Sequence, residues 1–97
     1  MEITKKVVGN TVELGLSGWM DTQSAPTLAE ALSQLEPGVE SLIFDMSGLE
    51  YTSSAGIRQI VAAYKQMKGA LILRHVTSEV REVLRMTGLD KRLTIEP

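Results

Sequence analysis

The stretch "LIFDMSGLEYTSSAGIRQIV", residues 42–61, predicts a strand that leads through a serine-containing turn into a helix. Leu42, Ile43 and Phe44 form an unbroken apolar run, which is the pattern of a central strand covered on both faces. After the serines, apolar residues recur at the spacing of one helical stripe: Ile57, Ile60, Val61, Tyr64 and Met67. A strand followed by a helix is the repeating unit of α/β folds.

The segments that follow repeat this alternation. Residues 70–76, "ALILRHV", predict another apolar strand, which begins just after a helix stop at Lys68-Gly69. Residues 77–88, "TSEVREVLRMTG", predict a helix, and residues 92–96, "RLTIE", a short last strand. Because strands joined through helices need right-handed crossovers, the sheet should be mainly parallel.

The N-terminal residues predict a β-hairpin. In residues 11–17, "TVELGLS", apolar residues alternate with polar or small ones, which is the period of a strand with one buried face. Residues 2–8, "EITKKVV", are a second extended segment. Gly9-Asn10 between them is a turn pair that closes antiparallel hairpins, because both residues tolerate positive φ.

A helix is predicted between this hairpin and the strand at Leu42. Four apolar residues fall on one helical stripe: Leu28, Ala31, Leu32 and Leu35. Pro26 suits the first turn, Ser24 is the expected cap, and Pro37-Gly38 should end the helix. The expected fold is therefore α/β, a single domain over residues 1–97 with an N-terminal hairpin and a mixed, mostly parallel sheet flanked by helices.

Length and composition describe a small globular domain, with 97 residues, 43% hydrophobic and 23% charged. A net charge of -2 and few aromatic residues argue against a nucleic-acid partner. The absence of cysteine excludes disulfides and thiolate metal sites. No apolar run approaches the roughly 20 residues that span a bilayer, and the start "MEITKKVVGN" has no apolar signal core. We expect a cytoplasmic protein without membrane insertion, metal or cofactor.

The alternation of strands and helices also predicts where a site lies. In open α/β sheets, ligands and partners meet the loops beyond the carboxyl ends of the parallel strands. Asp21 follows the second strand, Asp45 closes the third, and Thr52, Ser53 and Ser54 precede the second long helix. We expect these residues to share one end of the sheet.

Ser53 and Ser54 are compatible with several roles when only the residues are considered. A catalytic serine is disfavoured because the lone histidine, His75, belongs to the next strand and no Gly-x-Ser-x-Gly elbow is present. A nucleotide-binding loop is disfavoured because "TSSAGIR" has one glycine and no suitably placed lysine. A helix cap, the ordinary role of such a serine, and a phosphorylation site remain open.

Three segments together resemble the STAS family, the domain of anti-sigma factor antagonists and of sulphate-transporter tails. The stretch 42–61 resembles the family's core signature, a strand ending in Asp-Leu-Ser, an aromatic residue, a serine turn and a helix. Residues 16–32, "LSGWMDTQSAPTLAEAL", are similar to its Gly-x-x-Asp segment, and residues 69–95, "GALILRHVTSEVREVLRMTGLDKRLTI", to its closing strand, helix and Thr-Gly-Leu ending. The resemblance covers nearly the whole chain.

The resemblance implies a non-enzymatic anti-sigma factor antagonist. Free-standing bacterial members bind an anti-sigma factor that is itself a serine kinase and so displace the sigma factor. The kinase inactivates them by phosphorylating a serine in this turn, and a serine phosphatase restores them. With the family's turn glycine placed on Gly56, the phosphoacceptor falls on Ser54, with Ser53 as the alternative. Ser53 stands where many members have aspartate, and Ala55 where they have a second serine.

The same resemblance implies a partner-binding surface around the turn. Asp21 matches the family's acidic position near the phosphoacceptor, and Trp19 beside it offers an apolar contact. Gly56 leaves two roles open, close helix packing or room for an approaching kinase. The expected contact residues are Trp19, Asp21, Thr52, Ser53, Ala55, Gly56 and Arg58.

An alternative function is a constitutive STAS binding subunit of a transporter or sensor complex, which is not phosphorylated. Asp45 and His75 are expected to be structural, and the oligomeric state is open. Many members continue into a final helix where this sequence stops, at Pro97, so part of the family's usual packing is expected to be absent.

Overall fold

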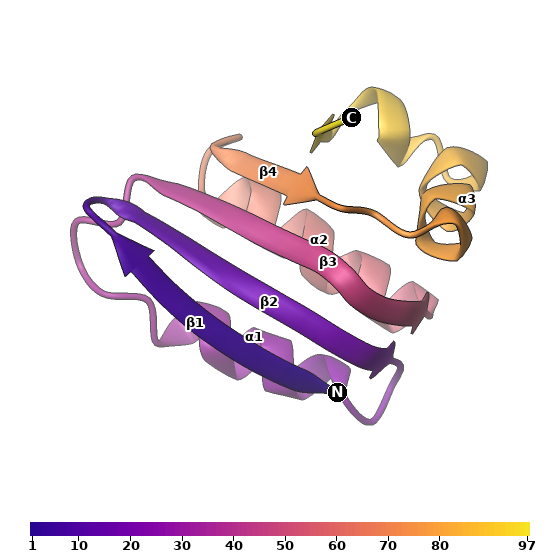
Figure 1. Cartoon of the computed structure of the whole chain (residues 1–97), viewed down its shortest axis with the longest axis horizontal. Coiled ribbons are helices and arrows are strands. Elements are labelled where there is room, and N and C mark those ends of the chain that lie inside the picture. The colour runs from indigo at the N-terminus through magenta and orange to yellow at the C-terminus, as the bar shows by residue number, and fades with distance from the viewer.

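The computed structural model describes residues 1–97 as a five-stranded sheet with helices (Figure 1). The strands are β1 Glu2–Val8, β2 Thr11–Met20, β3 Ser41–Thr52, β4 Leu71–Arg74 and β5 Thr94–Ile95. The helices are α1 Ala25–Ser33, α2 Ser54–Gln66, α3 Ser78–Met86 and the 3-10 helix η1 Leu89–Lys91. The strand order is β1-β2-β3-β4-β5, with β1 antiparallel to β2 and the other neighbours parallel, which confirms the predicted α/β class.

The predicted hairpin is confirmed. Val8 pairs with Thr11 across the Gly9-Asn10 turn. Gly9 has φ of 60°, whereas Asn10 is not among the residues with positive φ. The turn therefore needs glycine at its first central position only.

The helices α1 and α2 lie behind the sheet in the view of Figure 1, and the front face carries no helix. In β3, Leu42, Phe44 and Met46 are fully buried toward the helices, while Ile43 between them is half-buried. The prediction that this strand is covered on both faces is therefore wrong. The strands follow one another in a single direction across the sheet, so right-handed crossovers place successive helices on the same face.

β3 is longer than the apolar run predicted, because it continues beside β2 as far as Thr52. Its register with β2 shifts twice, between Gly15 and Ser17 and between Gly18 and Trp19, so β3 contains extra residues at two bulges. Asp45 consequently lies inside β3, paired with neighbours on both sides, and does not close the strand as predicted.

The ends of the remaining elements follow local backbone signals. α2 stops before Lys68 and Gly69, whose φ angles are 52° and 90°, as predicted for this helix end. β4 ends at Arg74, earlier than predicted, because His75 has φ of 56° and cannot continue an extended strand. α3 is attached to β3 by the hydroxyl of Thr77, which donates to the carbonyl of Leu49 at 2.9 Å.

Candidate functional site

The turn between β3 and α2 places its two serines in different environments. Ser54 is the first residue of α2 and is exposed. Ser53 occupies the N-cap position with extended backbone, φ -92° and ψ 178°, but its hydroxyl makes no capping hydrogen bond. The Ser53 Oγ is instead buried without a hydrogen-bond partner. The ordinary capping role is therefore not filled by a serine hydroxyl at this helix.

Close packing explains why a glycine stands at position 56. The residue is buried, and a Cβ atom on it would lie 2.3 Å from Thr52 Oγ1 and 2.8 Å from Met20 Cγ. Both distances are shorter than a carbon atom tolerates, so only glycine lets the first turn of α2 rest on the ends of β2 and β3. Of the two roles left open for Gly56, the packing role has a structural basis.

The other predicted contact residues of this turn divide into buried and exposed groups. Thr52 is 2% exposed and its hydroxyl donates to the Ser53 carbonyl at 3.2 Å, so it supports the turn from inside. Ala55 is half-buried. Arg58 is exposed one helical turn after Ser54, and residues four apart lie on the same face of a helix. The surface around Ser54 thus includes Arg58, whereas Thr52 and Gly56 lie beneath it.

Asp21 organises the loop between β2 and α1. Its Oδ1 accepts hydrogen bonds from the backbone N–H groups of Gln23 and Ser24, each at 3.0 Å. The Ser24 hydroxyl lies 3.0 Å from the same oxygen and 2.8 Å from the Trp19 carbonyl, and it accepts the Asp21 N–H at 2.9 Å. The backbone and side-chain hydrogen bonds from Ser24 are the main reasons that the pKa of Asp21 is lowered.

This arrangement changes the role expected of Ser24. The residue stands at the N-cap of α1, and Pro26 lies in the first turn as predicted, but the Ser24 side chain makes no capping bond. Its hydroxyl turns back toward Asp21, because the carboxylate of Asp21 already closes the turn. The Asp21 carboxylate, charged at neutral pH, is thereby held in a fixed position at the end of the sheet.

The Asp21 loop and the serine turn lie side by side. Met20 pairs with Thr52 in the β2–β3 register, and the Ser53 N–H donates to the Met20 carbonyl at 2.8 Å. Two of the three predicted loops therefore come together. The third expectation, that Asp45 joins them, is wrong, because Asp45 lies inside β3 well before the turn.

Asp45 forms a separate contact with the lone histidine. Asp45 Oδ1 accepts the Ser47 N–H at 3.0 Å and lies 3.2 Å from His75 Nδ1. Partial burial alone would raise the pKa of Asp45, but the hydrogen bonds from Ser47 and His75 outweigh it and lower the pKa. The two residues that were expected to be structural are thus paired with each other, away from the serine turn.

An exposed aromatic pair adjoins the serine turn. Trp19 and Tyr51 are partners in the β2–β3 register, and their ring centroids lie 5.3 Å apart with a 45° tilt. They are 58% and 44% exposed. Trp19 was predicted as a contact residue and Tyr51 was not. The sequence could have indicated Tyr51, because it is the aromatic residue that precedes the serine turn.

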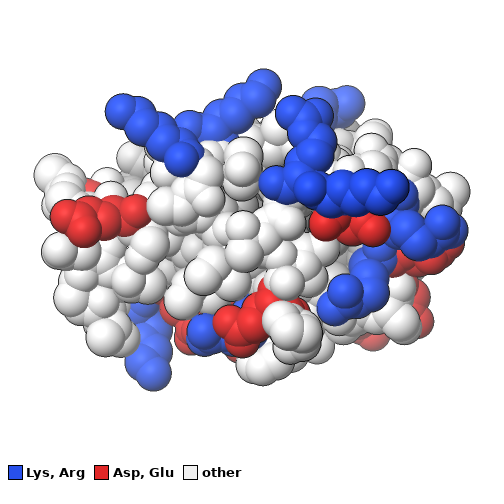
Figure 2. Space-filling model, turned by 90° about the horizontal axis from the view of Figure 1, so that it is seen from above, with Lys and Arg blue, Asp and Glu red and all other residues white.

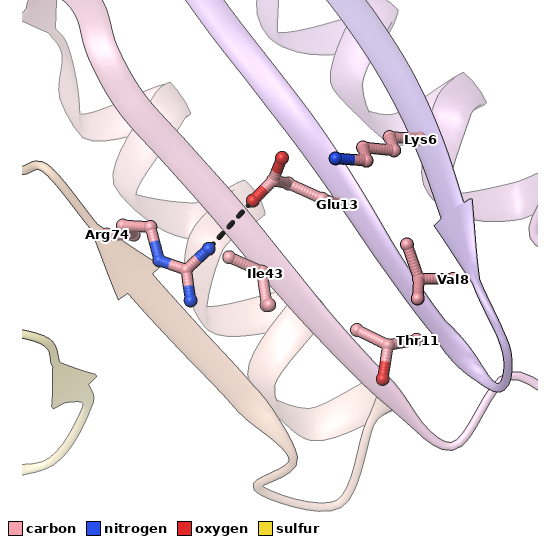
Figure 3. Close-up of a pocket in the computed structure, with 6 residues that line it drawn as sticks. All are labelled: Lys6, Val8, Thr11, Glu13, Ile43 and Arg74. Atoms are coloured by element: carbon pink, nitrogen blue, oxygen red, sulfur yellow. Dashed lines mark hydrogen bonds and ion pairs between the residues drawn. The ribbon is translucent and has the colours of Figure 1, made fainter.

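The helix-free face of the sheet carries an ion-pair network that the sequence did not indicate, and Figure 3 shows its Arg74–Glu13 pair. Arg74 Nη1 lies 2.9 Å from Glu13 Oε1, and Arg74 Nε lies 3.1 Å from Glu96 Oε1. Glu13 lies in β2, Arg74 at the end of β4 and Glu96 just after β5, so the residues of the network are far apart in the sequence. A hollow of about 290 Å³ beside the network is lined by Lys6, Val8, Thr11, Glu13, Ile43 and Arg74.

Charged side chains of both signs are spread over the rest of the surface. Basic side chains gather along one border of the face in Figure 2, and acidic side chains lie among and beside them. No group of three or more His, Asp or Glu side chains comes together in a way that could hold a metal ion. No helix is both long enough and apolar enough to cross a membrane.

Comparison with known proteins shows the family. The model of the STAS domain matches residues 2–97. BtrV of Bordetella bronchiseptica, a protein named as an anti-sigma factor antagonist, is 30% identical over 92 residues, which cover 91% of this chain and 79% of BtrV. The anti-sigma-B factor antagonist of Bacillus subtilis is 28% identical over 89 residues, which cover 89% of this chain and 82% of that protein.

Solved structures show the same fold. An anti-sigma factor antagonist from Mycobacterium paratuberculosis superposes with a TM-score of 0.87 at 22% identity, over 99% of this chain and 85% of that one. The anti-sigma factor antagonist SpoIIAA in its unphosphorylated form gives a TM-score of 0.80 at 19% identity, over 99% of this chain and 89% of that one. A phosphorylated form of SpoIIAA, from Bacillus, gives 0.67 at 19% identity, over 99% of this chain and 92% of that one.

Proposed function

This chain belongs to the STAS domain family, and we propose that it is an anti-sigma factor antagonist switched by phosphorylation of Ser54. In this proposal the unmodified protein binds an anti-sigma factor that is a serine kinase, and the sigma factor is released. Phosphorylation by that kinase ends binding, and a serine phosphatase restores it. The protein acts in the cytoplasm as a binding module and not as an enzyme. The names of its relatives support the general role.

The observation that carries the proposal is the contrast between the two serines. Ser54 is exposed at the start of α2, whereas the Oγ of Ser53 is buried. A kinase must bring the acceptor oxygen into line with the γ-phosphate of ATP, which a buried hydroxyl does not permit without local unfolding. Ser54 is therefore the proposed acceptor and Ser53 is not.

The fold should tolerate a phosphate on Ser54. The first N–H groups of a helix have no intrahelical partner, and the helix dipole favours a negative charge there by about 0.3–1 kcal/mol. Arg58, exposed one turn later on the same face of α2, supplies a nearby positive charge. Phosphorylation should thus change the surface without unfolding α2.

The same phosphate should prevent partner binding. It adds about -1.5 to -2 charges beside a loop that already holds the ionised carboxylate of Asp21. A partner surface that fits the neutral serine would have to remove water from the phosphate on binding. Any carboxylate of the partner near this position would also repel the phosphate. Since about 1.4 kcal/mol changes an affinity tenfold, a mismatch of a few kcal/mol switches binding off.

The experiment that tests this function measures complex formation with the anti-sigma factor encoded nearest to the gene. Isothermal titration calorimetry should show binding of the unmodified protein, and size-exclusion chromatography should show release of the sigma factor. The protein phosphorylated on Ser54 should bind at least about tenfold more weakly. Equal binding of both forms would refute the switch and favour a constitutive binding subunit, and no binding of either form would refute the antagonist function.

A further inference from the structure

A surface hollow of about 360 Å³ lies between the end of β3 and the first turn of α3. The residues that line it include Trp19, Leu49, Glu50 and Glu79, and none of them is a lysine or arginine. Trp19 also belongs to the aromatic pair beside the serine turn. The hollow therefore adjoins the proposed partner-binding surface and extends it toward α3.

The second bulge of β3 supplies the first carboxylate. The β2–β3 register passes from Gly18 opposite Leu49 to Trp19 opposite Tyr51, so Glu50 is the extra residue of β3 and has no partner in β2. Bulges of this kind redirect side chains. Leu49 is buried while Glu50 and Tyr51 are both exposed, and Glu50 lines the same hollow as Trp19.

The N-terminus of α3 supplies the second carboxylate. The hydroxyl of Thr77, at the N-cap of α3, donates to the carbonyl of Leu49 at 2.9 Å and fixes the helix against the bulge. Glu79 lies in the first turn of α3 and faces the same hollow. Its carboxylate accepts one side-chain hydrogen bond, from the Ser78 hydroxyl at 3.2 Å.

Neither carboxylate has a cationic partner in this chain. The ion pairs of the structure use Glu13, Glu36, Asp45, Glu82 and Glu96 as their acids. Glu50 and Glu79 take part in none of them. Beside them, Trp19 is 58% exposed. The hollow thus combines two carboxylates that lie outside every ion pair with an exposed tryptophan.

We infer that this hollow receives an arginine side chain of the protein partner. A guanidinium group is planar, so it can stack on an indole while its N–H groups donate to carboxylates at the edge of the ring. A lysine ammonium carries the same charge but is more strongly hydrated and cannot stack. The inference rests on the proposed function, because the partner meant is the anti-sigma factor bound at the adjacent serine turn.

The first test is the affinity of a double variant for that anti-sigma factor. Glu50→Gln combined with Glu79→Gln removes both charges and keeps the shapes of exposed side chains, so folding should not change. We expect binding to weaken by about tenfold or more. The matched control is Glu40→Gln, an exposed acid outside every ion pair and next to the start of β3, which should leave affinity unchanged. Unchanged affinity of the double variant would overturn the inference.

A second test needs no partner protein and so separates this inference from the proposed function. Trp19 is the single tryptophan, so its indole N–H gives one identifiable signal in an NMR spectrum of the ¹⁵N-labelled protein. N-acetyl-arginine amide should shift this signal more than N-acetyl-lysine amide at matched ionic strength. The shift should be lost in the double glutamine variant and kept in Glu40→Gln.

Which of the two tests applies depends on whether the anti-sigma factor binds the native protein. If the anti-sigma factor binds the native protein, the affinity of the double variant decides. If it does not bind, the proposed function fails, and the NMR titration alone tests whether the hollow binds an arginine side chain. An equal response to the arginine and lysine compounds, or a response that survives in the double variant, would then overturn the inference.

Discussion

The backbone N–H of Ser53 donates to the carbonyl oxygen of Met20 at 2.8 Å, which joins the end of β2 to the turn that follows β3. Because of this bond, the loop held by Asp21 and the exposed hydroxyl-bearing residue Ser54 lie at the same end of the sheet. The proposed switch depends on this closeness, since a charge added at Ser54 then alters the surface that Asp21 and Trp19 present.

Replacement of Gly56 tests the packing beneath the switch. Gly56→Ala should destabilise the protein by about 1–3 kcal/mol in chemical denaturation, because the new methyl group meets Thr52 and Met20. At an open helical position the same change stabilises by about 0.5–1 kcal/mol. Ala62→Gly, at an exposed position of α2, is the control for helix propensity and should cost about 1 kcal/mol. Stabilisation by Gly56→Ala would contradict the packing account.

A permanent charge at the proposed acceptor should imitate the modified state. Ser54→Glu should keep the circular dichroism spectrum and melting temperature of the native protein, because the start of α2 favours a negative charge. Its affinity for the anti-sigma factor, measured by calorimetry, should fall about tenfold or more. Ser33→Glu places the same charge on the exposed last residue of α1, away from the serine turn, and should not weaken binding. Equal losses in both variants would show that the position of the charge is unimportant.

The hydrogen bonds to Asp21 predict a pH dependence with a defined sign. The pKa of Asp21 is lowered from 3.8 in the folded protein, so its carboxylate contributes stability above pH 3.8 that is lost as the pH falls through the folded value. NMR titration of the Asp21 carboxyl carbon should give a pKa below 3.8. Asp21→Asn should be less stable than the native protein at neutral pH, and the difference should shrink in acid. A pKa at or above 3.8 would contradict the proposed loop geometry.

The ion-pair network on the helix-free face should contribute to stability in a salt-dependent way. Arg74→Gln removes the contacts to Glu13 and Glu96 and should lower the melting temperature by a few degrees in dilute buffer. High salt should reduce the difference, because at about 1 M the screening length is only about 3 Å. Arg81→Gln, at an exposed position outside every ion pair, should have little effect. Equal effects of the two changes would contradict this account.

Much of the fold was predictable because each element has a local signal. The Gly9-Asn10 turn, the proline in the first turn of α1 and the change of apolar period after the serines are properties of short segments. The parallel order of β2 to β5 then follows from the crossovers. What the sequence did not predict depends on neighbouring strands. β3 continues past Asp45 through polar residues because β2 supplies hydrogen-bonding partners as far as Met20.

The location of the candidate site was predictable from the sequence, but the exposure and hydrogen bonds of its side chains were not. Asp21 and the serines were expected together and are together, because both follow parallel strands. The exposure of Ser54, the buried oxygen of Ser53 and the missing side-chain cap depend on how α2 packs over Thr52, which a linear pattern does not encode. The contact between Asp45 and His75 was missed for the same reason, since a left-handed backbone at His75 brings the ring to β3.

The measurement that tests the central claim most directly is the site of phosphate transfer. The protein and its Ser53→Ala and Ser54→Ala variants would be incubated with ATP and the anti-sigma factor kinase encoded nearest to the gene, then analysed by intact-mass and tandem mass spectrometry. We predict one phosphate on the native protein and on Ser53→Ala, and none on Ser54→Ala. Loss of the phosphate only in Ser53→Ala, or no phosphate on any form with a kinase that is active and bound, would contradict the proposed switch at Ser54.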